Sequence, residues 1–192
     1  MVKAINEDKW VIIEILTKSF DQNKSINFVV KQDKKRTQRI KTLMEYSFNV
    51  CSVFGEVYLT DDKKGCVLLQ LPHQKKTTLK SILWDAKLGF ASIGIERALK
   101  VLGRESKVHS HHPETAYCYL WFIGVDPEHQ QSGRGSKLIR EAIEKYDALG
   151  IPIYLETSTL TNLPWYQKFG FEIFHEIEFT YKLYMLRRNV KK

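Results

Sequence analysis

The spacing of apolar residues changes several times along the chain, and each change marks an expected element. Val2 to Ile5 can form a short first strand, and Asn6 or Asp8 can cap the helix that follows. This helix is expected to run to about Phe20, with four residues on its inner face: Trp10, Ile13, Leu16 and Phe20. Helical spacing resumes after Asn23 and continues to Phe48, which predicts one or two further helices.

The middle of the chain predicts a hairpin followed by more helix. Ser52 to Leu59 and Gly65 to Leu71 flank a polar turn, so we expect two antiparallel strands. From Thr78 to about Ser110 the pattern is helical, with a break near Gly89. The apolar positions that support these two helices are Leu79, Ile82, Leu83, Ile95, Leu99 and Leu102.

The histidine-rich segment His109 to Pro113 is expected to be a solvated loop, with a role in a substrate pocket as the alternative. Its three histidines have no carboxylate or cysteine at a supporting spacing, so no metal site is predicted.

Tyr117 to Val125 is apolar at both alternating sets of positions, which is typical of a strand in the middle of a covered sheet. An amphipathic helix from Gly133 to Leu149 and a strand from Ile153 to Thr157 follow. One helix joining two strands across about thirty residues has the size of a parallel crossover. Asn162 can cap a short helix that Gly170 ends, and a closing antiparallel pair of strands is expected over 171–180 and 181–186.

Composition indicates a folded protein with an excess of positive charge. We expect one domain, residues 1–192, because neither a repeat nor a linker divides the chain. The net charge of +8 is compatible with nucleic acid, an anionic membrane or a polyanionic small ligand as partner. Its basic clusters, at 31–41, 75–80 and 187–192, are typical of solvated helix faces and tails, so neither nucleic acid nor membrane is expected as partner.

Cysteine usage and the N-terminal segment favour a cytoplasmic protein. The three cysteines, Cys51, Cys66 and Cys118, have no ligand spacing and are expected to be small buried residues. Met1 to Asp8 lacks the apolar core of a signal peptide, and no apolar run approaches the length of a membrane span.

The run Val125 to Lys137 contains the strongest functional signal. Gly133 and Gly135 open a helix, where backbone N–H groups without partners and the helix dipole favour a phosphate at Ser132 to Ser136. A Walker P-loop is excluded by the glycine spacing. A dinucleotide fingerprint would need a third glycine where Leu138 stands, and a helix start without any ligand stays open as a further alternative.

Gln130-Gln-Ser-Gly-Arg-Gly135 resembles the acetyl-CoA-binding motif of the GNAT superfamily of N-acetyltransferases, (Arg/Gln)-x-x-Gly-x-(Gly/Ala). The segment Asn162 to Phe171 is similar to the closing motif of that superfamily. Tyr154-Leu-Glu-Thr-Ser158, followed by Asn162-Leu-Pro, resembles its puromycin N-acetyltransferase branch. The resemblance covers about residues 115–175, and it extends to the N-terminal half only in element order.

This resemblance implies a mixed α/β fold with helices on both faces of a mostly antiparallel sheet of about six to seven strands. The two parallel strands are expected to splay apart and admit acetyl-CoA. Backbone groups of Phe122, Ile123 and Val125 would hold the pantetheine arm, and Asn162 would contact that arm or only cap its helix. The pyrophosphate would lie on the motif: Gln130, Gln131, Ser132, Gly133, Arg134, Gly135, Ser136 and Lys137.

Tyr166 occupies the family position of the general acid that protonates the leaving thiolate, with a buried packing residue as the alternative. Glu156, at the end of the second parallel strand, is the candidate general base acting through water, or else a structural or orienting carboxylate. The implied activity is direct acetylation of a primary amine of a small molecule by a monomer or homodimer. An acetyl-CoA-binding regulatory module and a protein or peptide acetyltransferase stay open as alternatives.

Overall fold

The computed structural model describes residues 1–190, and Lys191 and Lys192, the end of the basic tail, lie outside the described residues. The helices are α1 Lys9–Ser19, α2 Lys24–Val29, α3 Arg36–Phe54, α4 Leu79–Leu88, α5 Ala98–His109, α6 Arg134–Ala148 and α7 Leu163–Lys168. The strands are β1 Val2–Lys3, β2 Gly55–Leu59, β3 Gly65–Gln70, β4 Cys118–Val125, β5 Ile153–Thr157, β6 Glu172–Glu178 and β7 Lys182–Arg188.

All seven strands form one sheet in the order β1-β2-β3-β4-β5-β7-β6. Every neighbouring pair is antiparallel except β4 and β5, which are parallel and pair only at Cys118–Ile153 and Tyr119–Tyr154. Beyond these two pairs β4 and β5 separate, while β5 stays paired with β7 up to Thr157. The predicted mixed fold with a splayed parallel pair is therefore confirmed.

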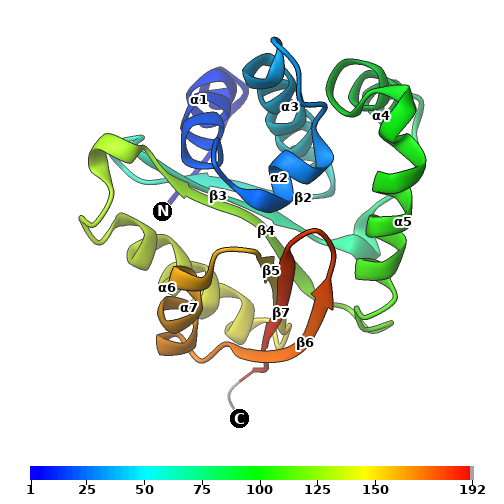
Figure 1. Ribbon diagram of the computed structural model, residues 1–192. Helices are drawn as coiled ribbons and strands as arrows, with labels where there is room; N and C mark the ends of the chain where they lie inside the picture. Colours follow the sequence, from blue (N-terminus) through cyan, green and yellow to red (C-terminus); the bar gives the residue numbers. More distant parts are fainter. Residues whose placement is uncertain (191–192) are drawn as a thin grey trace.

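Helices cover both faces of the sheet, with α1, α2 and α3 on one face and α6 and α7 on the other (Figure 1). On the first face, Leu16 and Met44 pack against sheet residues such as Leu68. On the second face, Leu138 and Ile139 pack against residues such as Leu155. Because each helix buries one apolar stripe, the sheet lies between two separate cores.

The hairpin prediction was wrong at its first boundary, since residues 52–54 form the last turn of α3 and β2 begins only at Gly55. A Cβ atom at Gly55 would lie 2.1 Å from the carbonyl oxygen of Leu69. Only glycine therefore lets the chain pass this closely from α3 into the sheet.

The inner face of α1 was also predicted with one wrong member. Trp10 is 66% exposed, whereas Ile12, Ile13 and Leu16 are buried. Each helical residue turns the chain by about 100°, so Trp10 points roughly opposite to Ile12. Lys9 places its Nζ 5.2 Å from the centre of the indole ring and leaves the ring in solvent.

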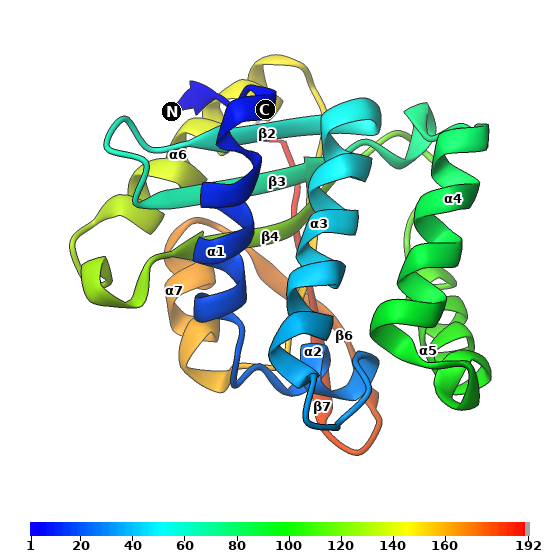
Figure 2. The same cartoon turned by 90° about the horizontal axis from the view of Figure 1, so that it is seen from above.

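The two helices predicted over 78–110 are present, joined by a π-helical turn over Gly89–Ile93, but their apolar positions do not face the core. We call these positions the outer apolar face, and all of them are more than half exposed: Leu79, Ile82, Leu83, Ile95, Leu99 and Leu102. The pair α4 and α5 lies beside α3 and outside the layers that cover the sheet (Figure 2). It is held mainly by other residues, such as Asp85, which accepts a 2.7 Å hydrogen bond from Tyr46 Oη, and Val101 and Val108, which are buried.

The three cysteines are free and buried, as predicted. No helix within residues 1–190 combines the length and the apolar character that crossing a membrane requires.

Candidate active site

The separation of β4 from β5 opens a cleft of about 740 Å³. One wall is the unpaired part of β4, including Trp121, Ile123 and Val125. Glu156 and Thr157, at the end of β5, line it as well. Because the backbone of β4 beyond Tyr119 has no strand partner on this side, its hydrogen-bonding groups are available to an extended ligand.

The glycine motif forms the far end of this cleft, at the start of α6. Gly133 has a φ of 80°, and Gln131 has a φ of 58°. These left-handed residues turn the chain sharply into the helix. The first helical hydrogen bond runs from Lys137 N–H to Gly133 C=O, so the N–H groups of 134–136 have no partner within the helix. Three free N–H groups at the positive end of a helix dipole can hold a diphosphate.

The two basic residues of the motif contact the turn between β2 and β3. Arg134 Nη2 lies 2.6 Å from Asp62 Oδ2, and Lys137 Nζ lies 2.5 Å from Asp61 Oδ2. The hydrogen bond from Arg134 lowers the pKa of the Asp62 carboxyl. Arg134 nevertheless lines the cleft, whereas Lys137 does not.

Tyr166 lies on α7 and also lines the cleft. Its ring is buried and packs edge-on against Trp165 and Phe171. Burial disfavours the charged phenolate and therefore raises the pKa of Tyr166 above its ordinary value of 10.0. A phenol in this setting stays protonated and can donate its proton.

Glu156 lines the same cleft with a side chain that is only 6% exposed. Its Oε1 accepts a 2.7 Å hydrogen bond from His112 Nε2, and its Oε2 accepts a hydrogen bond from Tyr119 Oη. These two hydrogen bonds, one to each carboxylate oxygen, hold the side chain of Glu156 in one orientation.

His112 is a site residue that the sequence analysis placed in a solvated loop, and this prediction was wrong for His112. Its side chain is almost fully buried, and Tyr117 Oη lies 3.0 Å from its Nδ1. When Tyr117 donates to Nδ1, the proton of the neutral ring is on Nε2 and points to Glu156. His112 and Glu156 are 44 residues apart, and no local sequence signal marks their contact.

The cleft brings together most of the residues predicted for the site. Phe122 is not on its wall, because its side chain packs edge-on against Phe20 in the core beneath α1. Asn162 is on the wall and stands at the N-cap position of α7, as predicted, but its side chain makes no capping hydrogen bond. The predicted residues that line the cleft are Ile123, Val125, Gln130, Gln131, Ser132, Gly133, Arg134, Gly135, Ser136, Glu156, Asn162 and Tyr166.

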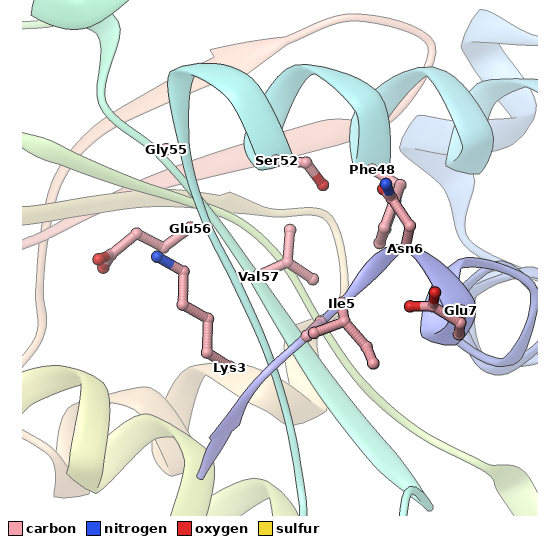
Figure 3. Close-up of a pocket in the computed structure, with 10 residues that line it drawn as sticks. Lys3, Ile5, Asn6, Glu7, Phe48, Ser52, Gly55, Glu56 and Val57 are labelled. Atoms are coloured by element: carbon pink, nitrogen blue, oxygen red, sulfur yellow. The ribbon is translucent and has the colours of Figure 1, made fainter.

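A smaller cavity of about 390 Å³ lies away from this site, among β1, β2 and α3 (Figure 3). Lys3, Phe48 and Glu56 are among the residues that line it, and none of the predicted site residues is there. Asp126, Glu128 and His129, in the turn before the motif, place ligand atoms within 4.8 Å of one another. Asp126 already caps this turn by accepting the Glu128 N–H, which accounts for the grouping.

Comparisons with known proteins agree with this geometry. Residues 85–173 match the model of the acetyltransferase (GNAT) domain. An uncharacterized N-acetyltransferase of Schizosaccharomyces pombe is 38% identical over 73 residues, which are 38% of this chain. The match covers 27% of that curated relative, so this chain spans only a small part of its length.

Solved structures match over almost the whole chain. A structure described as histone acetyltransferase HPA2 and related acetyltransferase, from Corynebacterium glutamicum, has a TM-score of 0.70 and 16% identity, covering 100% of this chain and 96% of that one. Arylalkylamine N-acetyltransferase 2 from Aedes aegypti has a TM-score of 0.65 and 14% identity, covering 98% and 97%. A GNAT family acetyltransferase from Brucella melitensis, solved in complex with acetyl-CoA, has a TM-score of 0.52 and 15% identity, covering 99% and 86%.

At these identities the solved structures are evidence for the fold alone, whereas the family model matches the sequence of the motif and of the strands around it. Residues 85–173 thus match the acetyltransferase (GNAT) domain model, and the fold of the whole chain is similar to that of solved acetyltransferases, one of them in complex with acetyl-CoA.

Proposed function

We propose that the protein is an N-acetyltransferase that moves the acetyl group of acetyl-CoA to a primary amine of a small molecule by direct attack. The observation that carries this proposal is a single cleft with an anion site at one end and a buried tyrosine and carboxylate on its walls. The anion site is the start of α6, and the two side chains are Tyr166 and Glu156.

The residues of the cleft suit the co-substrate. The free N–H groups of 134–136 would hold the pyrophosphate, and the unpaired backbone of β4 would hold the pantetheine arm through Ile123 and Val125. A backbone N–H in this part of β4 would donate to the thioester oxygen, an interaction of about 3 kcal/mol in comparable oxyanion sites. The Asn162 side chain makes no capping hydrogen bond and so is free to contact the arm.

Acetyl-CoA, when bound, supplies the thioester carbonyl that the amine nitrogen attacks. Glu156 accepts the proton that the amine loses as its nitrogen bonds to the carbonyl carbon, directly or through one water. Tyr166 donates its proton to the sulfur as the carbon–sulfur bond breaks, so that free thiol and amide are the products. His112 and Tyr119 hold Glu156 in place through their hydrogen bonds to its two oxygens.

A small-molecule acceptor is favoured by the likeness of Tyr154 to Ser158, with Asn162-Leu-Pro, to the puromycin N-acetyltransferase branch. The similar solved structures include an arylalkylamine N-acetyltransferase and a protein described as a histone acetyltransferase. A peptide or protein amine is therefore the second candidate for the acceptor.

Thiol release from acetyl-CoA tests the proposal, measured over a panel of aryl and alkyl amines, aminoglycosides, amino acids and peptides. We expect acetyl-CoA to bind in calorimetry, to raise the melting temperature, and to release thiol with at least one small amine. Binding without thiol release on the whole panel would favour the regulatory module. Absence of binding would contradict the proposal itself.

A further inference from the structure

A buried cation lies just behind the wall of the cleft without a buried counter-charge. Arg104, on α5, has a side chain that is 10% exposed, and its one carboxylate contact among residues 1–190 is Glu105, which is 56% exposed. A buried guanidinium is costly unless it is paired, because water no longer stabilises its charge. A further anion near Arg104 would therefore stabilise its buried charge.

Arg104 and Tyr181 both form hydrogen bonds with Ser25, which lines the cleft. Arg104 Nη2 donates to Ser25 Oγ at 2.7 Å, and Arg104 Nε donates to Tyr181 Oη at 2.9 Å. Tyr181 Oη in turn donates to Ser25 Oγ at 3.3 Å. The hydrogen bond from the buried guanidinium polarises the Ser25 hydroxyl, which lines the cleft and has a proton of its own to donate to a ligand there.

The opposite charge lies close by on the same cleft. Glu156 is the one acidic residue among the described residues that line it, and no lysine or arginine is paired with it. Ser158 follows Glu156 by two residues, a separation of about 7 Å along an extended chain. Ser158 Oγ accepts a hydrogen bond from the Ser25 N–H at 3.4 Å, which ties the two ends of this region together.

Extending the proposed function, we propose that the acceptor substrate is an amino-carboxylate whose amine approaches Glu156 and whose carboxylate binds Ser25, with Arg104 behind it. The amine of such a molecule would match the charge of the Glu156 carboxylate, and its carboxylate would match the charge of the Arg104 guanidinium. The spacing suits substrates in which several bonds separate the amine from the carboxylate. A charge-assisted hydrogen bond from Ser25, which Arg104 polarises, would then distinguish an acid from its neutral amide.

Matched pairs of substrates test this inference. The probes are 4-aminobutyrate, 5-aminopentanoate and 6-aminohexanoate, each compared with its carboxamide by thiol release from acetyl-CoA. For at least one pair we expect the acid to have a kcat/KM about tenfold or more above that of the amide, mainly through KM. In Ser25→Ala and in Arg104→Gln this preference should fall to about twofold or less, with the kinetics of the amide largely retained.

Two controls separate binding from folding. Arg104 links α5 to the turn before β7 through Tyr181, so Arg104→Gln can also lower stability, whereas Ser25→Ala removes one hydroxyl only. Both variants must still bind acetyl-CoA, and Arg140→Gln, an exposed arginine on α6, should keep the wild-type preference.

Equal turnover of acid and amide, no turnover of any amino-carboxylate, or an unchanged preference in both variants would overturn the inference and leave the N-acetyltransferase proposal standing. Failure of that broader proposal would appear separately, as absence of acetyl-CoA binding or of thiol release with every amine tested.

Discussion

Tyr166 combines two properties of a general acid, a position on the cleft and a raised pKa. Burial stabilises the neutral phenol, so the proton is retained well above neutral pH and is lost only beyond the ordinary titration range. The wild-type rate should therefore not decline between pH 8 and pH 10 on account of Tyr166.

We expect Tyr166→Phe to lower kcat by about 100-fold, a typical loss for a general acid. The dissociation constant of acetyl-CoA should stay within about twofold of wild type, because the ring still packs on Trp165 and Phe171. Steady-state kinetics and calorimetry measure the two quantities. An unchanged kcat would assign Tyr166 to packing alone.

The cysteines permit a second prediction at the residue scale. Burial raises the pKa of all three thiols, Cys51, Cys66 and Cys118, so thiolate is scarce near neutral pH and access is blocked. Ellman's reagent at pH 8 should detect no rapidly reacting thiol in the native protein and three after urea unfolding. Rapid reaction of one native thiol would contradict the buried positions of these residues.

Sequence could predict residues near a motif but not contacts between distant segments. Tyr166 and Glu156 were predicted because each stands at a fixed place in a local pattern. His112 and Arg104 escaped prediction, because their partners, Glu156 and Ser25, are 44 and 79 residues away. Only the packing of separate helices, loops and strands in the folded chain brings these segments together.

At the scale of elements, the start of α6 depends on one glycine conformation. Gly133 has a φ of 80°, and nothing lies within 4 Å of a Cβ placed there, so an alanine would be strained by the backbone alone. That strain is about 1 to 2 kcal/mol for a non-glycine residue. Relief of the strain would turn the N–H groups of 134–136 away from the diphosphate.

Gly133→Ala should therefore raise the dissociation constant of acetyl-CoA by about tenfold. Gly150→Ala is a matched control, because Gly150 has a φ of 69° with equally open space but lies beyond the other end of α6. It should lower stability by about 1 kcal/mol and leave acetyl-CoA binding unchanged. Equal effects of both substitutions on binding would mean that the conformation of Gly133 has no local role.

The elements themselves were predicted better than the faces they bury. Periodicity identified α1, α4 and α5, yet Trp10 and the apolar residues of α4 and α5 face solvent. Apolar spacing establishes that a helix is amphipathic, but the neighbour that covers each stripe depends on the topology. The buried side of α5 contains Arg104, a charged residue that hydrophobic patterning predicts to be exposed to solvent.

For the molecule as a whole, the exposed outer apolar face of α4 and α5 implies an uneven distribution of stability. The sheet and α6 share a core in which Leu138 is fully buried, whereas Leu99 on α5 is 85% exposed. Truncation of a buried leucine to alanine costs about 2 to 5 kcal/mol because it leaves a cavity. Exposed positions away from special contacts change stability by about 0.5 kcal/mol or less.

Leu83→Gln and Leu99→Gln should therefore leave the free energy of unfolding nearly unchanged, while Leu138→Ala lowers it by at least about 2 kcal/mol. Urea unfolding followed by circular dichroism, at two protein concentrations about tenfold apart, measures these differences. A large loss in the two glutamine variants at both concentrations would mean that the outer apolar face is packed within the chain. A loss that grows with protein concentration would instead mean that another copy covers this face, since association stabilises the native state by mass action.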